Sequence, residues 1–382
     1  MILWVNLCNN TQYLVNQQMV SIKYQKIGEL FCGPGGIGLG ASLAKLEVGN
    51  ANYKFDTQWA TDIDLDSCNT YKQNLISESD SERIICSDIK NIDFNDLDSI
   101  NGLTFGFPCN DFSMLGQRAG GGGGITGEYG PLYTYGVKAL QHFKPDWFMA
   151  ENVSSLTSSD EGKAFEKILS ELNLSGYNLT THLYRFEKYG IPQKRHRIII
   201  VGIRNDINKS FRVPAPISNV YVSSKEALEN PPISINAANN EITQQSKTVV
   251  ERLKHIKPGE NAFTAEIPEK LKLNIKGAKI SQIYKRLDPN LPSYTVTGSG
   301  GGGSHVYHWE ENRSLTNRER ARLQSFPDDY VFSGSKESVR KQIGMAVPPM
   351  GVKIILESLL KTLHGIQYPY VDSNLPVQYK LI

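Results

Sequence analysis

The first half of the chain alternates short apolar segments with segments whose apolar residues recur at helical spacing. The apolar segments predict strands at residues 26–31, 58–60, 83–86, 102–106, 147–150 and 197–201. Helices are predicted through residues 41–46 and through residues 165–172, the second with a capping box formed by Ser158 and Glu161. This alternation predicts an α/β fold with a doubly wound, mostly parallel sheet. Ligands of such folds bind at the carboxyl ends of the strands.

Length and composition indicate a globular protein with two lobes. The chain has 382 residues, 40% of them hydrophobic and 21% charged, and a net charge of +2. A nucleic-acid binder with so little net charge must concentrate its positive residues locally. The 5 cysteines, at positions 8, 32, 68, 86 and 109, include no C-x-x-C pair, so we expect a reduced, intracellular protein without a metal site. We expect neither a membrane span nor a signal peptide, because the start at Met1 turns polar by Asn9.

The second half begins with an irregular region. From about Asn205 to Asp288 the chain is rich in Asn, Lys, Pro and Ser and shows little periodicity, which predicts a second, smaller lobe. A basic run from Lys270 to Arg286 contains Lys276 and Lys279; it is either a solvated face or a strip that contacts phosphates. A glycine-rich segment follows at residues 295–304. Two helices close the chain, one capped by Thr316 and Glu319 before Pro327, and one over residues 351–363.

A glycine-rich turn follows the first predicted strand. Gly33, Gly35 and Gly38 satisfy G-x-G-x-x-G, which suits a nucleotide cofactor at a helix N-terminus but is as easily a purely structural tight turn. Asp62 and Asp88 end the next two strands. A carboxylate at the first position can hold ribose hydroxyls, and one at the second can accept from an adenine amino group, although either alone is commonly a helix cap.

Polar residues at three further strand ends favour nucleophilic chemistry. Cys109 follows a rigid proline, Pro108, and precedes a polar segment whose glycines make it a candidate lid. Glu151 and Asn152 end the next strand, and Arg195 and Arg197 begin another. A cationic neighbourhood lowers a thiol's pKa and burial raises a carboxyl's, which suits a thiolate working beside a protonated acid.

These motifs resemble the cytosine-5 DNA methyltransferase family, of the bacterial restriction-modification type. The matching pieces are FCGPGG, GFPCNDFS, ENV, QKRHR, RERARLQSFPDDY and QIGMAVPP, in the family's order from about Ile27 to Leu363. The resemblance implies a Rossmann-like, S-adenosylmethionine-dependent fold. It also implies attack of a thiolate on carbon 6 of a flipped-out cytosine, which makes carbon 5 nucleophilic enough to take a methyl group.

The resemblance also implies the site residues. Cys109 is expected as the nucleophile and Glu151 as the acid at ring nitrogen 3, with Arg197 at the cytosine carbonyl, and Arg195 helping to place the base and the thiolate. Pro108 and Asn152 are expected to support the catalytic loop. The expected cofactor residues are Phe31, Gly33, Gly35, Gly36, Asp62, Ile63, Asp88, Ile89 and Pro108. The expected DNA contacts are Ser113, Thr295, Val296, Ser299, Ser304, Lys276 and Lys279.

The family resemblance also predicts domains and partners. We expect an N-terminal extension (1–21, dispensable at least before Met19), a catalytic domain (22–208 and 345–366), a target-recognition domain (209–313), a linking helix and hinge (314–344) and a tail (367–382). The expected partner is double-stranded DNA, with a cognate restriction endonuclease acting on the same site without a stable complex. We expect a monomer in the cytoplasm, associated with the nucleoid.

Several departures and rival functions bear on this assignment. Met345 stands where the family usually has Asn, Asn110 where Gln is more usual, and Ile63 where an aromatic residue often flanks the adenine. His196 is expected to be a solvent-facing spacer. A nicotinamide dehydrogenase would explain the glycine turn but not Cys109. Two rival functions share the methyltransferase fold: a catalytically dead binding protein and a tRNA methyltransferase.

Overall fold

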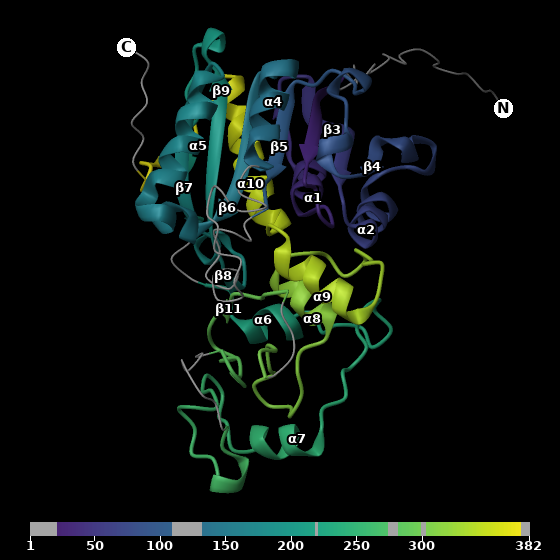
Figure 1. The fold of residues 1–382 in the computed structure, drawn as a ribbon, viewed down its shortest axis with the longest axis vertical. Helices are drawn as coiled ribbons and strands as arrows, with labels where there is room; N and C mark the ends of the chain where they lie inside the picture. Colours follow the sequence, from purple (N-terminus) through teal and green to yellow (C-terminus); the bar gives the residue numbers. More distant parts are fainter. Residues whose placement is uncertain (1–20, 109–131, 218–220, 274–281, 299–302, 376–382) are drawn as a thin grey trace, which may run out of the picture.

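The molecule divides into a sheet-containing lobe and a smaller, irregular lobe (Figure 1). The computed structural model describes residues 21–108, 132–217, 221–273, 282–298 and 303–375. The sheet lies in the first lobe and has the order β2-β3-β1-β5-β6-β9-β7, with β4 also paired to β3. Its strands are β1 Ser21–Leu30, β2 Lys45–Val48, β3 Ala51–Asp62, β4 Ile84–Cys86, β5 Gly102–Gly106, β6 Trp147–Val153, β7 Tyr177–Arg185 and β9 His196–Arg204.

The predicted doubly wound α/β fold is confirmed. The pairs β1/β3, β1/β5, β3/β4 and β5/β6 are parallel, while β2, β7 and β9 pair antiparallel with their neighbours. Helices α4 (Tyr133–Phe143) and α5 (Lys163–Leu174) contribute to the apolar core on one face, and α1 (Gly36–Leu43) and α10 (Pro349–Leu363) to the core on the other. Helix α2 (Leu65–Leu75) lies beside β4. The helices thus cover both faces and leave the carboxyl ends of the strands open to the second lobe.

Two local predictions in this lobe are wrong. The helix expected through residue 46 ends at Leu43, because the chain turns extended at Ala44 (φ −77°, ψ 134°) and Lys45–Val48 pairs with β3. Leu46 is therefore a buried strand residue. The capping box expected at Ser158 does not form: residues 154–162 make 3-10 turns, the Ser158 hydroxyl donates to the Ser155 carbonyl, and α5 begins after Gly162 (φ 88°).

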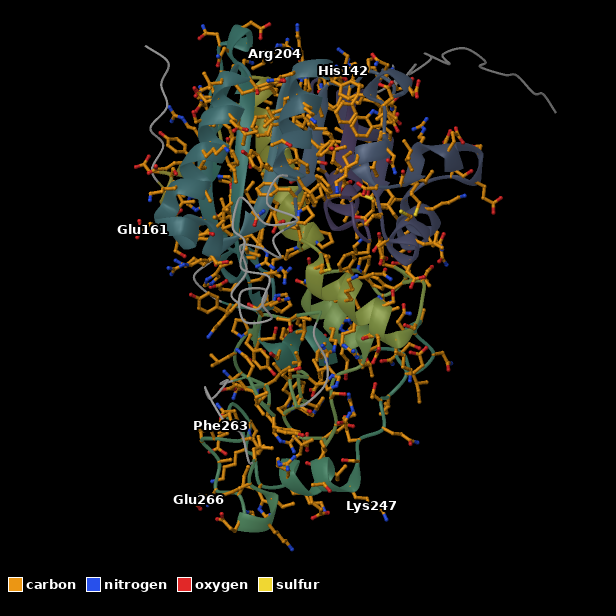
Figure 2. All side chains as sticks on the ribbon, in the orientation of Figure 1. His142, Glu161, Arg204, Lys247, Phe263 and Glu266 are labelled. Atoms are coloured by element: carbon orange, nitrogen blue, oxygen red, sulfur yellow. The ribbon has the colours of Figure 1, made fainter. Side chains whose placement is uncertain are left out.

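The second lobe contains short elements around small apolar clusters. These are α6 Ser224–Glu229, α7 Lys247–Leu253, α8 Asn317–Leu323, α9 Lys336–Met345 and β11 Ser293–Tyr294. β11 pairs with β8 (Gln193–Lys194), which lies in the chain between β7 and β9 of the sheet lobe. The labelled residues Lys247, Phe263 and Glu266 mark the far end of this lobe, opposite Arg204 and His142 of the sheet lobe (Figure 2). Residues 213–214 (β10) pair with residues 370–371 (β12) beside the sheet lobe.

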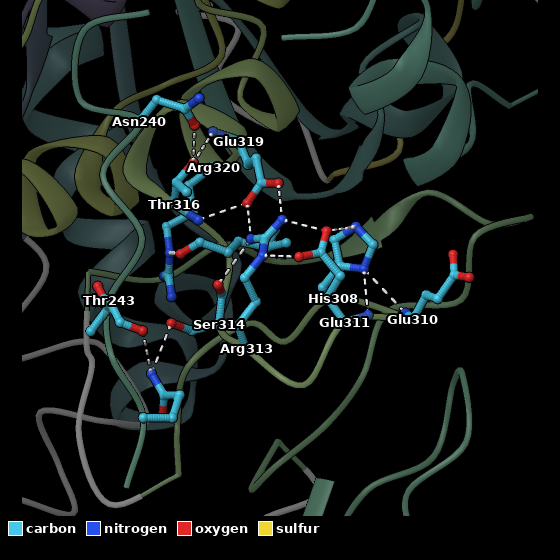
Figure 3. A network of polar contacts seen from close by, with 12 residues as sticks. Asn240, Thr243, His308, Glu310, Glu311, Arg313, Ser314, Thr316, Glu319 and Arg320 are labelled. Carbon is cyan, nitrogen blue, oxygen red and sulfur yellow. Dashed lines mark hydrogen bonds and ion pairs between the residues drawn. The ribbon is translucent and has the colours of Figure 1, made fainter. Parts of the chain in front are cut away.

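The capping box predicted for α8 is confirmed. The Thr316 hydroxyl accepts from the Glu319 N–H, and the Glu319 carboxylate accepts from the Thr316 N–H at 2.7 Å. Arg313 donates to both oxygens of Glu319, each at 2.8 Å, and also pairs with Glu311 (Figure 3). The Thr316 hydroxyl lies 2.8 Å from the Asn240 side chain. The start of α8 is thus tied to two loops of the second lobe.

One helical stretch of the described chain is long and apolar enough to compare with a membrane span. It covers residues 336–363, and 72% of its most apolar window is buried inside the molecule. Its two parts, α9 and α10, are separated by Ala346–Pro348, and the apolar side chains of α10 belong to the core. Its burial is that of a core helix pair.

Candidate active site

The carboxylate of Asp62 lies against the glycine-rich turn. Asp62 is the last residue of β3, which pairs with β1, so the turn after β1 lies next to it. Its Oδ2 accepts the Gly33 N–H at 2.8 Å and its Oδ1 accepts the Asp64 N–H at 2.9 Å. Burial raises the pKa of Asp62, and these N–H donors partly offset the rise. Each oxygen retains a lone pair, so the carboxylate can still accept from hydroxyl groups.

The glycines of the turn serve two different needs. A Cβ on Gly36 would lie 2.4 Å from the Val347 carbonyl oxygen, so only glycine lets α1 approach the start of α10. A Cβ on Gly33, which has φ 54°, would meet nothing within 4 Å, so this backbone faces open space. Phe31 also has a positive φ, 56°, which a side chain rarely adopts and which is typical of functional sites.

The other expected cofactor residues surround this turn in different ways. The Ile63 side chain is 69% exposed, although it is apolar and adjacent to Asp62. Asp88 accepts the Lys90 N–H at 3.0 Å and so caps a short 3-10 turn, whereas the cap of α2 is Asp64. Ile89 is buried in the core. An apolar side chain and two carboxylates therefore line the strand ends beside an open glycine backbone.

Glu151 and Arg197 form an ion pair at the end of β6. The Arg197 Nε lies 2.9 Å from Glu151 Oε1, and the two side chains are 13% and 11% exposed. Burial raises the pKa of Glu151, while the charges of Arg197 and Arg195 oppose the rise. A Cβ on Gly106, the neighbour of Glu151 on β5, would approach its Oε2 to 3.3 Å. Glycine there keeps the space over the carboxyl free.

Asn152 holds the backbone at Phe107, two residues before the expected nucleophile, with a side-chain hydrogen bond. Its side-chain amide is buried and donates to the Phe107 carbonyl at 3.1 Å, while its oxygen accepts the Val153 N–H at 2.8 Å. The bond holds the backbone that leads into Pro108, which is half-buried. Cys109, Asn110 and Ser113 lie outside the described residues, so the structure does not place them.

Arg195 connects the two lobes. It is fully buried, and its guanidinium donates to the carbonyls of Val296 at 3.1 Å, Gly344 at 2.9 Å and Met345 at 3.4 Å. These acceptors all lie in the second lobe, two of them at the end of α9. The guanidinium thus holds the lobes together in this arrangement.

Two glutamines extend this connection. Gln193 donates to Gln324 Oε1 at 2.8 Å and accepts the Val296 N–H at 2.9 Å, and Gln324 donates to the Ile343 carbonyl at 2.7 Å. Both glutamines are fully buried. Gln193 belongs to the QKRHR motif, but the sequence motifs did not predict the part played by Gln324. In the sequence, the role of Gln324 is indicated only by its position within the RERARLQSFPDDY motif.

Thr295 and Val296, which we call the T-V element, lie beside the arginines. β11 pairs in parallel with β8, the Thr295 hydroxyl donates to the Lys194 carbonyl at 2.7 Å, and Val296 is buried. Ser304 is half-buried nearby in the chain, whereas Ser299, Lys276 and Lys279 fall outside the part of the chain that is described.

Two further residues of the sequence motifs have defined surroundings. His196, expected to be a solvent-facing spacer, has a side chain that is 39% exposed, and its Nε2 lies 2.9 Å from the buried Glu187. Met345, at the end of α9, has a side chain that is 62% exposed. No group of three His, Cys, Asp or Glu side chains that could hold a metal occurs among the described residues.

Comparison with known proteins gives one consistent family. The family model "C-5 cytosine-specific DNA methylase" matches residues 25–361. The type II methyltransferase M.BbvI of Brevibacillus brevis is 53% identical over 92% of this chain and 95% of its own. The type II methyltransferase M.NgoFVII of Neisseria gonorrhoeae is 39% identical over 91% of this chain and 89% of its own.

Solved structures with low sequence identity share the fold. A DNA modification methyltransferase encoded within a prophage of E. coli superposes with a TM-score of 0.68 at 22% identity, covering 89% of this chain and 99% of its own. The Dnmt2 methyltransferase of S. pombe gives a TM-score of 0.52 at 19% identity over 89% and 98% of the two chains. The likeness extends across both lobes.

Proposed function

The chain belongs to the C-5 cytosine-specific DNA methylase family and is a DNA cytosine-5-methyltransferase, and on that premise we propose how its residues divide the work. The observation that carries the proposal is the buried Glu151–Arg197 pair at 2.9 Å, next to the strand end that leads to Cys109. In this proposal Cys109 is the nucleophile. The protein serves as the modification enzyme of a restriction-modification system.

The methyl donor is proposed to be S-adenosylmethionine, bound at the glycine turn. The residues there fit it: the open backbone at Gly33 suits a close ligand, Asp62 has spare lone pairs for ribose hydroxyls, and the exposed Ile63 offers an apolar surface for an adenine ring. Phe31, Gly35, Gly36, Asp88, Ile89 and Pro108 complete the proposed set. When bound, this cofactor supplies an electrophilic methyl group. The protein's part is to orient it and to exclude water.

The protein activates the cytosine ring in two ways. The Cys109 thiolate adds to carbon 6, and the Glu151 carboxyl donates to ring nitrogen 3, where negative charge develops. Burial raises the pKa of Glu151, which favours the protonated carboxyl that this task needs, while the charge of Arg197 opposes the rise. The Arg197 guanidinium, 2.9 Å from Glu151, is proposed to contact the cytosine carbonyl. Asn152 positions the backbone before Pro108. Water is proposed to accept the carbon 5 proton.

Arg195 is proposed to act mainly by holding the lobes in register. Its three backbone acceptors are far from it in the chain, and one of them belongs to Val296 in the T-V element. A lobe that reads the DNA must be held at a set position relative to Glu151 if the flipped base is to reach it. This connection supports the role that we propose.

The substrate is proposed to be double-stranded DNA containing a specific sequence. A stacked cytosine cannot reach the site, so the base must be flipped out. Residues 209–313 are proposed to read the sequence, with 314–344 as a linking helix and hinge. Ser299 and Ser304, in the segment from Thr295 to Trp309, are proposed to contact base edges, and Lys276 and Lys279 to contact phosphates. Ser113, Thr295 and Val296 are further proposed DNA contacts. Phosphate contacts set the salt dependence of affinity, so neutralising Lys276 and Lys279 should flatten that dependence on any DNA.

Methyl transfer to DNA and to tRNA, measured side by side with labelled S-adenosylmethionine, tests the proposal. Labelled DNA and unlabelled tRNA are expected, and sequencing the modified cytosines gives the target. The Cys109→Ser variant is the control for covalent catalysis. Label in tRNA alone would refute the substrate. We further propose that the enzyme works as a monomer in the cytoplasm, on the nucleoid, alongside a cognate endonuclease.

A further inference from the structure

Two cysteines that the methyl-transfer proposal does not use lie next to each other beside Asp62. Cys68 is in the first turn of α2, and Cys86 is the last residue of β4, directly across from Asp62 in the sheet. The Cys68 thiol donates to the Asp62 carbonyl at 3.5 Å, and the Cys86 thiol donates to the Ile63 carbonyl at 3.9 Å. The two thiols therefore donate to the carbonyls of adjacent residues, which places them against the same short segment at the end of β3.

The two thiols differ in access to solvent. Cys86 is exposed, whereas Cys68 is 3% exposed. An exposed thiol reacts first with a dissolved oxidant, and a buried thiol in contact with it can then resolve the product. Cys32 is buried as well, so Cys86 is the one exposed thiol among the described cysteines. The arrangement therefore suits Cys86 as the thiol that reacts with the oxidant and Cys68 as the thiol that converts the oxidised Cys86 into a disulfide.

We propose that Cys68 and Cys86 form a reversible disulfide that weakens cofactor binding, an inference that rests on the cofactor site proposed above. With hydrogen peroxide as the oxidant, the Cys86 sulfur attacks one peroxide oxygen, the O–O bond breaks, and a sulfenic acid and water result. The Cys68 sulfur then attacks the Cys86 sulfur and displaces the hydroxyl, which leaves as a second water. Two thiols lose two electrons, and one peroxide is reduced to two waters.

The disulfide would change the geometry around Asp62. Two sulfur atoms in a disulfide lie about 2.0 Å apart, closer than two thiols in contact, so its formation draws the start of α2 towards the end of β4. Both thiol donors to the carbonyls of Asp62 and Ile63 are lost at the same time. Since the Asp62 carboxylate is positioned against the Gly33 N–H, a shift of this loop moves the proposed ribose acceptor.

The test uses the full-length chain carrying Cys109→Ser, so that oxidation of the proposed nucleophile cannot affect the result. The protein is treated with hydrogen peroxide, digested without reduction and mapped by mass spectrometry, and its affinity for S-adenosylhomocysteine is measured by calorimetry. We expect a peptide linked through Cys68 and Cys86, and affinity that falls roughly tenfold and returns with dithiothreitol. Adding Cys86→Ser, a change at an exposed position, should abolish both effects.

Three outcomes would contradict these inferences in different ways. A folded, oxidised protein without the Cys68–Cys86 peptide overturns the disulfide. A disulfide that leaves the affinity unchanged, or an equal loss of affinity in the Cys86→Ser variant, overturns its effect on the cofactor. Failure of the reduced protein to bind S-adenosylhomocysteine refutes the proposed cofactor site instead, and the linked peptide still decides whether the disulfide forms.

Discussion

Glu29, in β1 just before the glycine-rich turn, is a fully buried carboxyl, and its ionisation should lower the stability of the protein as the pH rises. It is 0% exposed, its Oε2 accepts the Tyr71 hydroxyl at 2.9 Å, and its Oε1 has no hydrogen-bond partner among the described residues. Burial raises its pKa from 4.5 to about 8, and the charge of Asp62 adds to the rise while the bond from Tyr71 opposes it. Glu29 is therefore protonated in the folded protein at neutral pH.

The sign of the pH dependence follows from this shift. Below pH 4.5 both the folded and the unfolded chain carry the proton, and the stabilisation is complete. As the pH rises to about 8, the unfolded chain loses the proton first, so the free energy of unfolding falls. The interval spans roughly 3.5 pH units at about 1.4 kcal/mol each, so Glu29 accounts for a loss of about 5 kcal/mol.

The substitution Glu29→Gln tests this, because glutamine is a neutral isostere that accepts from Tyr71 and does not ionise. Urea unfolding followed by circular dichroism from pH 5 to pH 8 should show the wild type losing about 3.5 kcal/mol more than the variant over that range, since the unfolded carboxyl is already partly ionised at pH 5 and the folded one only half ionised at pH 8. Glu82→Gln, at an exposed carboxyl, is the control and should run parallel to the wild type. Parallel curves for wild type and Glu29→Gln would refute the assignment of a buried, protonated acid.

Three further outcomes are expected. Arg197→Met removes the cation that lowers the pKa of Glu151, so the alkaline limb of kcat/KM should move to higher pH, and an unmoved limb would contradict the role of Glu151. Cys109→Ser should abolish methyl transfer and leave S-adenosylhomocysteine binding intact in calorimetry; near-normal turnover would exclude covalent catalysis. Arg195→Met should cost about 3–5 kcal/mol in urea unfolding, because the buried carbonyls of Val296 and Gly344 lose their charged donor. Arg204→Met, with partly exposed ion pairs, should cost about 1 kcal/mol or less, and equal losses would argue against the connection between the lobes.

Sequence patterns predicted a helix or strand correctly where all the groups that stabilise it lie within one short segment of the chain. Thr316 and Glu319 form their capping box because both partners lie within one turn of α8. The same spacing at Ser158 and Glu161 fails, since Gly162 takes a positive φ and starts α5 later. Leu46 fits a helical face and an alternating strand equally well, and the partner strand decides between them. A capping spacing or an apolar period therefore does not decide the structure alone. A following glycine or a partner strand can change where the helix or strand forms.

The residues of the candidate site also fall into those that local sequence and sheet topology predict and those that depend on contacts distant in the chain. Asp62, Glu151 and Asn152 could be predicted because a parallel sheet brings its strand ends to one edge whatever the loops do. Arg195 was expected at the base, yet its guanidinium donates to carbonyls 101 and 149 residues away. Every residue has a backbone carbonyl, so a sequence motif cannot predict which carbonyls will accept these hydrogen bonds. The position of the second lobe relative to Glu151 depends on such bonds, which is why residue types predict the chemistry while only the folded chain reveals how the lobes are held in register.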